Sequence, residues 1–165
     1  MAIREITPDD KDALTESLHH MSEESIYKRF LSPKPDFSDG ELRYLTEVDG
    51  CDHYALVATP DTHPDQIRAV GRFVRLADEP ETAEVAIVVA DHLQGQGLGR
   101  QLGLALADAA RERGIRQFTA TMLGDNVAAQ RLLTTISKRV REGVAGGVRN
   151  LTVELGDGMG LGLAA

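Results

Sequence analysis

Residues 84–113 constrain the fold of this chain more than any other segment. Residues 85–90 form an apolar run rich in valine and isoleucine, which favours a strand that is covered on both faces. The turn that follows holds three glycines in five positions: Gly95, Gly97 and Gly99. Apolar residues then recur at helical spacing from Leu98 to Gly114, where the helix is expected to end. The segment therefore predicts a strand, a glycine-rich turn and a helix.

The glycine-rich turn is expected to bind an anion of pyrophosphate size. A helix begins with backbone amides that have no partner, and its dipole favours negative charge at that end. Glycine lets the backbone take positive φ and approach a ligand closely. A Walker loop is excluded because no lysine follows the glycines. A dinucleotide fingerprint fits poorly, because the spacing is G-x-G-x-G and residues 117–122 carry no acid.

The pattern that fits is Q-x-x-G-x-G, formed by Gln94, Gly97 and Gly99. With its strand and helix, it resembles the acyl-CoA-binding signature of the GNAT acetyltransferase superfamily. The resemblance continues through residues 118–123, which read as a strand, and through an N-x-x-A-x-x-L helix that begins at Asn126. Near the N-terminus, the pattern S-x-x-S-x-Y-x-R-F at residues 22–30 is similar to a helix of bacterial protein-lysine acetyltransferase GNAT domains.

The order of elements predicts an α/β fold of mixed type. Helices are expected after Thr7, Ser22 and Ser38, where capping residues stand. Strands and hairpins are expected at residues 2–6, 53–59 with 67–76, 82–90, 118–123, and 139–144 with 148–155. Together with the resemblance, this order implies one GNAT-like domain over residues 1–155, with a mixed, mostly antiparallel sheet and helices on both faces. Residues 156–165 hold four glycines and are expected to form a disordered tail.

Composition narrows the partners and the compartment. The net charge of −8 argues against binding of nucleic acid or anionic membranes and favours cationic partners. Cys51 is the only cysteine, so no disulfide framework exists and a reducing compartment is expected. No apolar run approaches the ~20 residues that span a bilayer. We therefore expect a cytoplasmic protein. The histidines show no metal-ligand spacing with one another or with Cys51, so no metal site is expected.

The resemblance implies an acetyl-CoA-dependent N-acetyltransferase that works by direct attack of an amine on the thioester, without a metal. Main-chain groups around Val88 and Val89 are expected to bind the pantetheine arm. Asn126 is expected to contact pantetheine or to cap its helix. The expected pyrophosphate cradle consists of Gln94, Gly95, Gln96, Gly97, Leu98, Gly99 and Arg100.

Glu84 is the candidate general base. It begins the central strand on the same face as Ala86 and Val88, and partial desolvation there is expected to raise the pKa of its carboxyl group. The resemblance to lysine acetyltransferases supports this role. The alternative is an acid that solvates the strand end or pairs with Arg72 or Arg75.

The acceptor is expected to be a primary amine, first a protein lysine and second a small molecule, and a homodimer is left open as an assembly. Acidic residues of the N-terminal third are expected to attract that cation: Glu23, Glu24, Glu41, Glu47 and Asp49. Many GNAT enzymes carry a tyrosine late in the helix that begins at Asn126, and none stands here. Ser137 or water would then protonate the leaving thiolate, or no acid is required because a CoA thiolate is already a fair leaving group. The missing tyrosine also leaves open a catalytically silent acyl-CoA-binding module.

Overall fold

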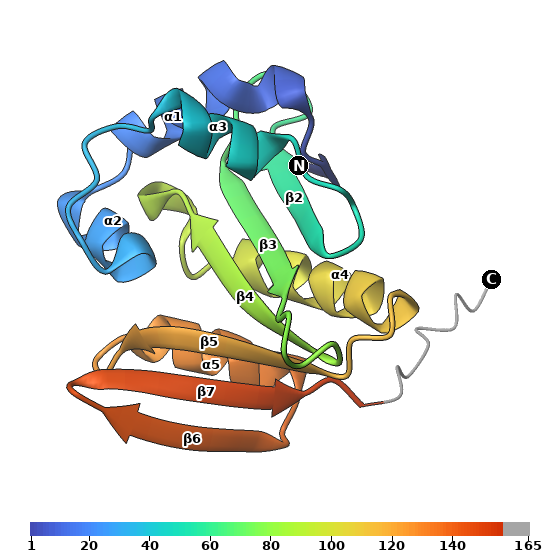
Figure 1. Cartoon of the computed structure of the whole chain (residues 1–165). Coiled ribbons are helices and arrows are strands. Elements are labelled where there is room, and N and C mark those ends of the chain that lie inside the picture. The colour runs from blue at the N-terminus through green and yellow to red at the C-terminus, as the bar shows by residue number, and fades with distance from the viewer. Residues whose placement is uncertain (157–165) are drawn as a thin grey trace.

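A seven-stranded sheet forms the centre of the protein, in a computed structural model that describes residues 1–156 (Figure 1). Its strands run in the order β1-β2-β3-β4-β5-β7-β6. Their bounds are β1 Ala2–Glu5, β2 His53–Thr59, β3 Ala69–Arg75, β4 Thr82–Val89, β5 Gln117–Leu123, β6 Val140–Ala145 and β7 Val148–Glu154. Neighbouring strands are antiparallel except β4 and β5, which are parallel and joined by a helical crossover.

Residues 1–156 contain five α-helices, three of which directly follow a capping residue that the sequence indicates. They are α1 Lys11–His19, α2 Glu23–Phe30, α3 Asp39–Thr46, α4 Leu98–Glu112 and α5 Val127–Ile136, and short 3-10 turns cover Pro8–Asp10 and Asp91–Leu93. The Ser22 hydroxyl caps α2 and the Ser38 hydroxyl caps α3, each at 3.2 Å from a backbone amide. Gly114 follows α4 with φ 77°, a conformation that suits glycine at a helix end.

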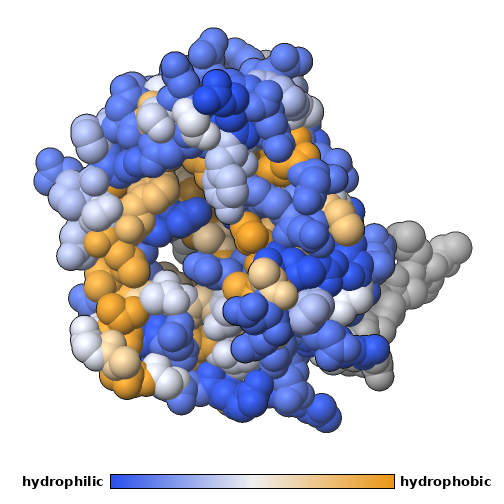
Figure 2. Space-filling view, in the orientation of Figure 1, coloured by the Kyte–Doolittle hydropathy of each residue, from blue (hydrophilic) through white to orange (hydrophobic). Residues whose placement is uncertain are grey.

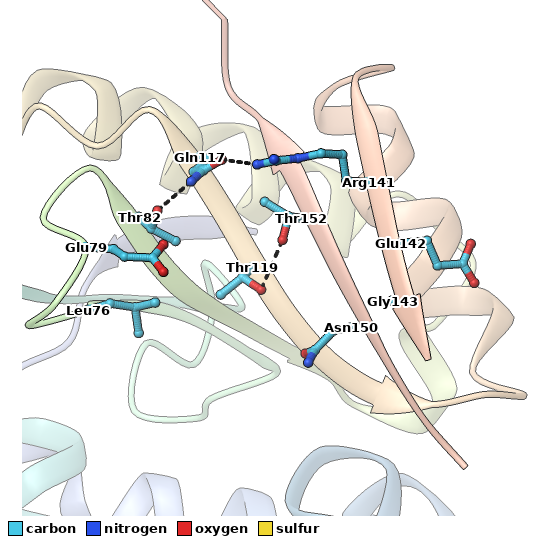
Figure 3. Close-up of a pocket in the computed structure, with 10 residues that line it drawn as sticks. All are labelled: Leu76, Glu79, Thr82, Gln117, Thr119, Arg141, Glu142, Gly143, Asn150 and Thr152. Atoms are coloured by element: carbon cyan, nitrogen blue, oxygen red, sulfur yellow. Dashed lines mark hydrogen bonds between the residues drawn. The ribbon is translucent and has the colours of Figure 1, made fainter. Parts of the chain in front are cut away.

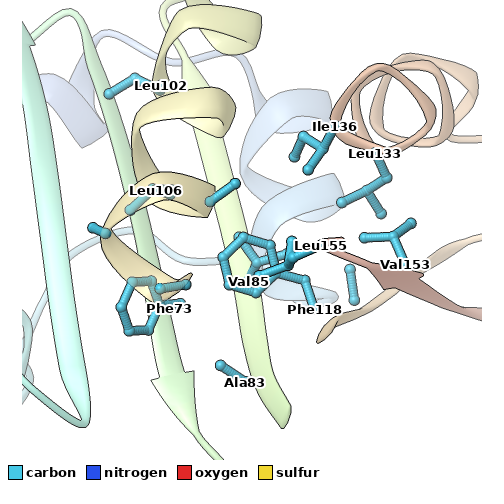
Figure 4. Close-up of a cluster of buried hydrophobic side chains, with 14 of the residues drawn as sticks. Phe73, Ala83, Val85, Leu102, Leu106, Phe118, Leu133, Ile136, Val153 and Leu155 are labelled. Carbon is cyan, nitrogen blue, oxygen red and sulfur yellow. The ribbon is translucent and has the colours of Figure 1, made fainter. Parts of the chain in front are cut away.

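Helices cover both faces of the sheet, as predicted. α4 and α5 lie on one face, and α1, α2 and α3 lie on the other, over the half that contains β2, β3 and β4 (Figure 1). The main core lies under α4, where Phe73, Phe118, Leu102 and Leu106 have no exposed surface (Figure 4). A second core joins α1 to the opposite face. The expected tail falls outside the described residues apart from Gly156, so the domain boundary at residue 155 stays a prediction.

Candidate active site

The sheet opens between β4 and β5. The two strands pair only where residues 82–84 lie beside residues 117–119, although β4 continues to Val89 and β5 to Leu123. Beyond Glu84 the strands diverge, so this edge of β4 has no strand partner along residues 85–89. Figure 2 shows the surface hollowed at this place, between the half that carries α1–α3 and the half that carries β5–β7. The pairing thus leaves an opening in the middle of the sheet.

This opening corrects two expectations about β4. The strand was expected to be covered on both faces, but residues 86–89 are only half-buried because β5 turns away from them. Glu84 was expected to be partly desolvated, but its side chain is exposed. Of the alternatives to a general base, pairing of Glu84 with Arg72 or Arg75 is not observed, since Arg75 pairs with Asp52 and no ion pair of Glu84 occurs within residues 1–156. Glu84 therefore stands in solvent at the point where the sheet begins to open.

The glycine loop follows β4 directly and leads into α4. Gly95 and Gly97 have φ of 76° and 89°, so both use the freedom that only glycine has there. The first backbone bond into the helix runs from the Gln101 amide to the Gly97 carbonyl at 3.1 Å. The amides of residues 98–100 therefore precede the intrahelical ladder, and nothing lies within 4 Å of a Cβ built on Gly97. Arg100 is exposed at this helix end.

Two further glycines let α5 approach α4 beside this loop. A Cβ built on Gly99 lies 3.7 Å from the Leu132 side chain, and one on Gly103 lies 3.1 Å from Ile136. Asn126 caps α5, because its Oδ1 accepts from the Ala129 amide at 3.2 Å. Of the two roles expected for Asn126, helix capping is the one that these contacts show.

The side chain of Gln94 folds back onto the strand before it. Its Nε2 donates to the Val89 carbonyl at 3.1 Å. Asp91, in the same loop, accepts from the Ser22 amide at 2.8 Å and from the hydroxyls of Ser22 and Ser25. Burial raises the pKa of Asp91, but these hydrogen bonds outweigh burial and hold it below its ordinary value. The serines of the N-terminal pattern thus attach α2 to the glycine loop.

Charged and aromatic side chains gather near Glu84 on the face of α1–α3. Arg72 of β3 lies opposite Ala86 of β4 and is only 6% exposed. Its Nη1 donates to the Leu45 carbonyl at 3.0 Å and to His53 Nε2 at 2.9 Å. His53 packs against the ring of Tyr44, with 4.8 Å between centroids. Arg72 was not assigned to a site from the sequence. The signal that could have indicated one was a charged residue inside an otherwise apolar strand.

A polar groove is lined in part by Thr82, and Figure 3 shows the side chains around it. Its volume is about 600 Å³, and its floor comes from β4, β5, β6 and β7. Gln117 lies at its end, donating to Thr82 Oγ1 at 2.7 Å and accepting from Arg141 Nη2 at 2.9 Å. Thr82 precedes Glu84 by one strand period, so the two side chains lie on the same face of β4.

The acidic surface expected on the N-terminal third is largely neutralised. Glu24 pairs with Lys28, Glu41 with Lys34 and Glu47 with Lys11. Asp49 instead accepts from the backbone amides of Cys51 and His53. The attraction of this surface for a cation is therefore weaker than the sequence suggests.

Residues 1–156 contain no cluster of three metal-ligating side chains. None of their helices is long and apolar enough to cross a membrane.

Comparison with known proteins supports the interpretation of this geometry. Residues 16–135 match the Acetyltransferase (GNAT) family. The chain is 35% identical over 131 residues to Acetyltransferase Pat of Mycolicibacterium smegmatis, which covers 79% of the chain and 39% of that protein. Across three curated relatives, the chain spans 39%, 62% and 47% of their lengths.

Solved structures agree with this family in fold. The GNAT domain of S. lividans PAT superposes with a TM-score of 0.84 at 31% identity, covering 93% of this chain and 89% of that one. The protein yncA of Salmonella typhimurium, solved with its cofactor acetyl-CoA, has the same fold at 21% identity and a TM-score of 0.73, over 96% and 95% of the two chains. With its open β4–β5 pair, its glycine loop and these matches, the chain belongs to the GNAT family of acetyltransferases.

Proposed function

We propose that this protein is an acetyl-CoA-dependent N-acetyltransferase that moves an acetyl group to a primary amine by direct attack on the thioester. The observation that carries the proposal is the opening between β4 and β5, which begins at Glu84 and leads into the glycine loop. The acetyl-CoA bound to yncA supports the choice of donor.

In this proposal the pyrophosphate lies against the amides of residues 94–100, at the start of α4. The pantetheine arm runs along the unpaired edge of β4 at Val88 and Val89. The Val89 carbonyl already accepts a hydrogen bond from Gln94. When acetyl-CoA binds, Gln94 either gives up this hydrogen bond or shares the carbonyl with acetyl-CoA. Asn126 keeps its cap and borders the same opening through α5.

The chemistry needs a neutral amine, because an ammonium group has no lone pair for attack. A free lysine amine has a pKa of about 10.4, so Glu84 removes its proton, directly or through one water. The amine nitrogen then bonds to the acetyl carbon and the carbon–sulfur bond breaks. Ser137 ends α5 and accepts from the Arg139 amide at 3.1 Å. Asn126 borders the opening at one end of α5, and Ser137 stands at the other end of that helix. Water is therefore the better proton source for the thiolate.

For the acceptor, a protein lysine is our first choice. The serine pattern of α2 supports it through its resemblance to lysine acetyltransferase domains. A small amine is second, and one relative favours it. The chain is 40% identical over 81 residues to a protein named L-2,4-diaminobutyric acid acetyltransferase from Streptomyces coelicolor, across 48% of this chain and 47% of that protein.

The test is release of CoA thiol from acetyl-CoA in the presence of a panel of lysine peptides and small diamines. Turnover that depends on the amine supports the enzyme. The competing function is a silent acyl-CoA-binding module, which the missing tyrosine favours. Calorimetric binding of acetyl-CoA with no turnover of any amine would support that module instead.

A further inference from the structure

Arg29 and Arg72 are two cations that form no ion pair within the described residues 1–156. Arg72 is almost fully buried, and both of its hydrogen-bond partners, the Leu45 carbonyl and His53, are polar groups without a carboxylate. Arg29 of α2 is half-buried and lies over the Phe30 ring, 4.9 Å from its centroid. Within residues 1–156, no carboxylate oxygen lies within 4 Å of either guanidinium group.

The local charges do not balance. Burial, and then repulsion by Arg29, lowers the pKa of Arg72 to about 10, and burial also lowers the pKa of Arg29. Guanidinium groups stay protonated in proteins at neutral pH, so we count both arginines as charged. Burial, and then the charge of Arg72, lowers the pKa of His53 to about 4, so His53 is neutral. Glu84 is the acid close enough to favour the charged form of Arg29. Two positive charges and one negative charge leave the cluster with an excess of one cation, and buried charge without a partner is costly.

The two arginines face one place. Both line a small cavity of about 30 Å³ between α1, α2, α3 and the sheet, and most of its other lining side chains are apolar, among them Leu14, Phe30 and Ala86. Ala86 and Glu84 are successive residues on one face of β4, and Arg72 lies opposite Ala86. Glu84 therefore stands between this cavity and the polar groove that Thr82 lines. A group held by the arginines would lie next to the atom that Glu84 deprotonates.

We propose that Arg29 and Arg72 form a subsite for a carboxylate that the substrate carries near its reacting group. Guanidinium groups bind carboxylates through paired, charge-assisted hydrogen bonds, and one carboxylate cancels the excess charge of the cluster. The inference rests on the proposed acetyltransferase function and deepens it. A lysine within a protein has no carboxylate near its amine, so the carboxylate comes either from the second choice of acceptor, a small amine that is an amino acid, or from the far end of a dicarboxylic acyl chain that replaces acetyl.

Two substrate pairs separate these sources. With acetyl-CoA as donor, L-lysine is compared with 1,5-diaminopentane, which lacks only the carboxylate. With one fixed amine, succinyl-CoA is compared with butyryl-CoA. We expect the wild type to prefer the carboxylate-bearing member of one pair in kcat/KM, and Arg29→Gln to lower that preference at least tenfold. The pair that responds identifies the source.

Arg72→Lys provides a second variant, because it keeps the buried charge but removes the planar fork. It should lower the same preference. Arg116→Gln is the control, since Arg116 is exposed and pairs with Glu81 at the surface. Its preference should equal that of the wild type. If both site variants keep a preference within twofold of the wild-type value, the subsite is overturned. A wild type that prefers neither carboxylate-bearing substrate would overturn it as well.

A binding measurement decides the matter even if no amine is turned over. Glutarate should raise the melting temperature of the wild type, by mass action on the folded state, and the neutral diamide glutaramide should not. Arg29→Gln should lose this shift and Arg116→Gln should keep it. In that case the subsite stands although the acetyltransferase proposal has failed. An equal glutarate shift in Arg29→Gln and the wild type, or no shift in either, would contradict the subsite.

Discussion

Asp91 accepts a hydrogen bond from the Ser25 hydroxyl, which lies 66 residues earlier in the chain. The same carboxylate holds the Ser22 amide at 2.8 Å. None of the residues of α2 is buried, so this helix depends on polar contacts more than on packing for its position. Because α2 also carries Arg29, the contact links the glycine loop to the cluster beside Glu84.

Asp91→Ala should release α2 from the loop. The loss of hydrogen bonds to a charged acceptor at an exposed site is expected to lower the free energy of unfolding by about 1 kcal/mol. The larger effect is local, because a helix without buried residues opens independently of the core. Hydrogen exchange of the α2 amides should become at least tenfold faster. Asp65→Ala, at another exposed acid, should leave it unchanged, and equal exchange in both variants would contradict the role of Asp91.

Gly97→Val should weaken acetyl-CoA binding at least tenfold, or about 1.4 kcal/mol, because a branched side chain would stand between the backbone and the pyrophosphate. Valine also strains a backbone whose φ is 89°, and this costs about 1–2 kcal/mol of stability. Gly114→Val is the matched control, since Gly114 has φ 77° and equally open surroundings at the other end of α4. Calorimetry should show lost affinity only in Gly97→Val. Unchanged affinity would remove the pyrophosphate assignment.

The sequence allowed the elements to be predicted nearly residue by residue, because periodicity, caps and glycines are local signals. The open β4–β5 pair is not indicated by any local pattern, since it depends on where β5 turns away from β4. The exposure of Glu84 was missed for a similar reason. Alternation shows which face a side chain occupies, but what covers that face depends on helices distant in the sequence. The Arg29–Arg72 cluster and the link between Ser25 and Asp91 are long-range in this same sense.

His53 should make stability depend on pH. Burial, and then Arg72, lowers its pKa from 6.5 to about 4 in the folded state, while Asp49 opposes this shift. The unfolded chain therefore binds more protons between these values, so stability is complete above pH 6.5 and falls as the pH approaches 4. The loss is at most about 3 kcal/mol. Denaturant unfolding of wild type and His53→Gln across this range should show a shallower pH dependence in the variant.

His92→Gln serves as the control for His53, because His92 is exposed in the loop after β4. Its pH dependence should follow that of the wild type. If His53→Gln and the wild type lose stability in parallel between pH 6.5 and 4, then other groups titrate in this window and the account of His53 is wrong.

Glu84→Gln tests the general base, since it keeps the shape of the side chain and removes its basicity. Acetyl-CoA affinity should stay unchanged, while turnover near neutral pH should fall roughly 10²–10⁴-fold. Higher pH should restore part of the turnover, because solvent then deprotonates the amine. Glu81→Gln, at an exposed acid just before β4 that pairs with Arg116, should retain wild-type turnover. Because Glu84 is exposed, a water relay is open to it, and wild-type turnover of Glu84→Gln at pH 7 would mean that water alone accepts the proton.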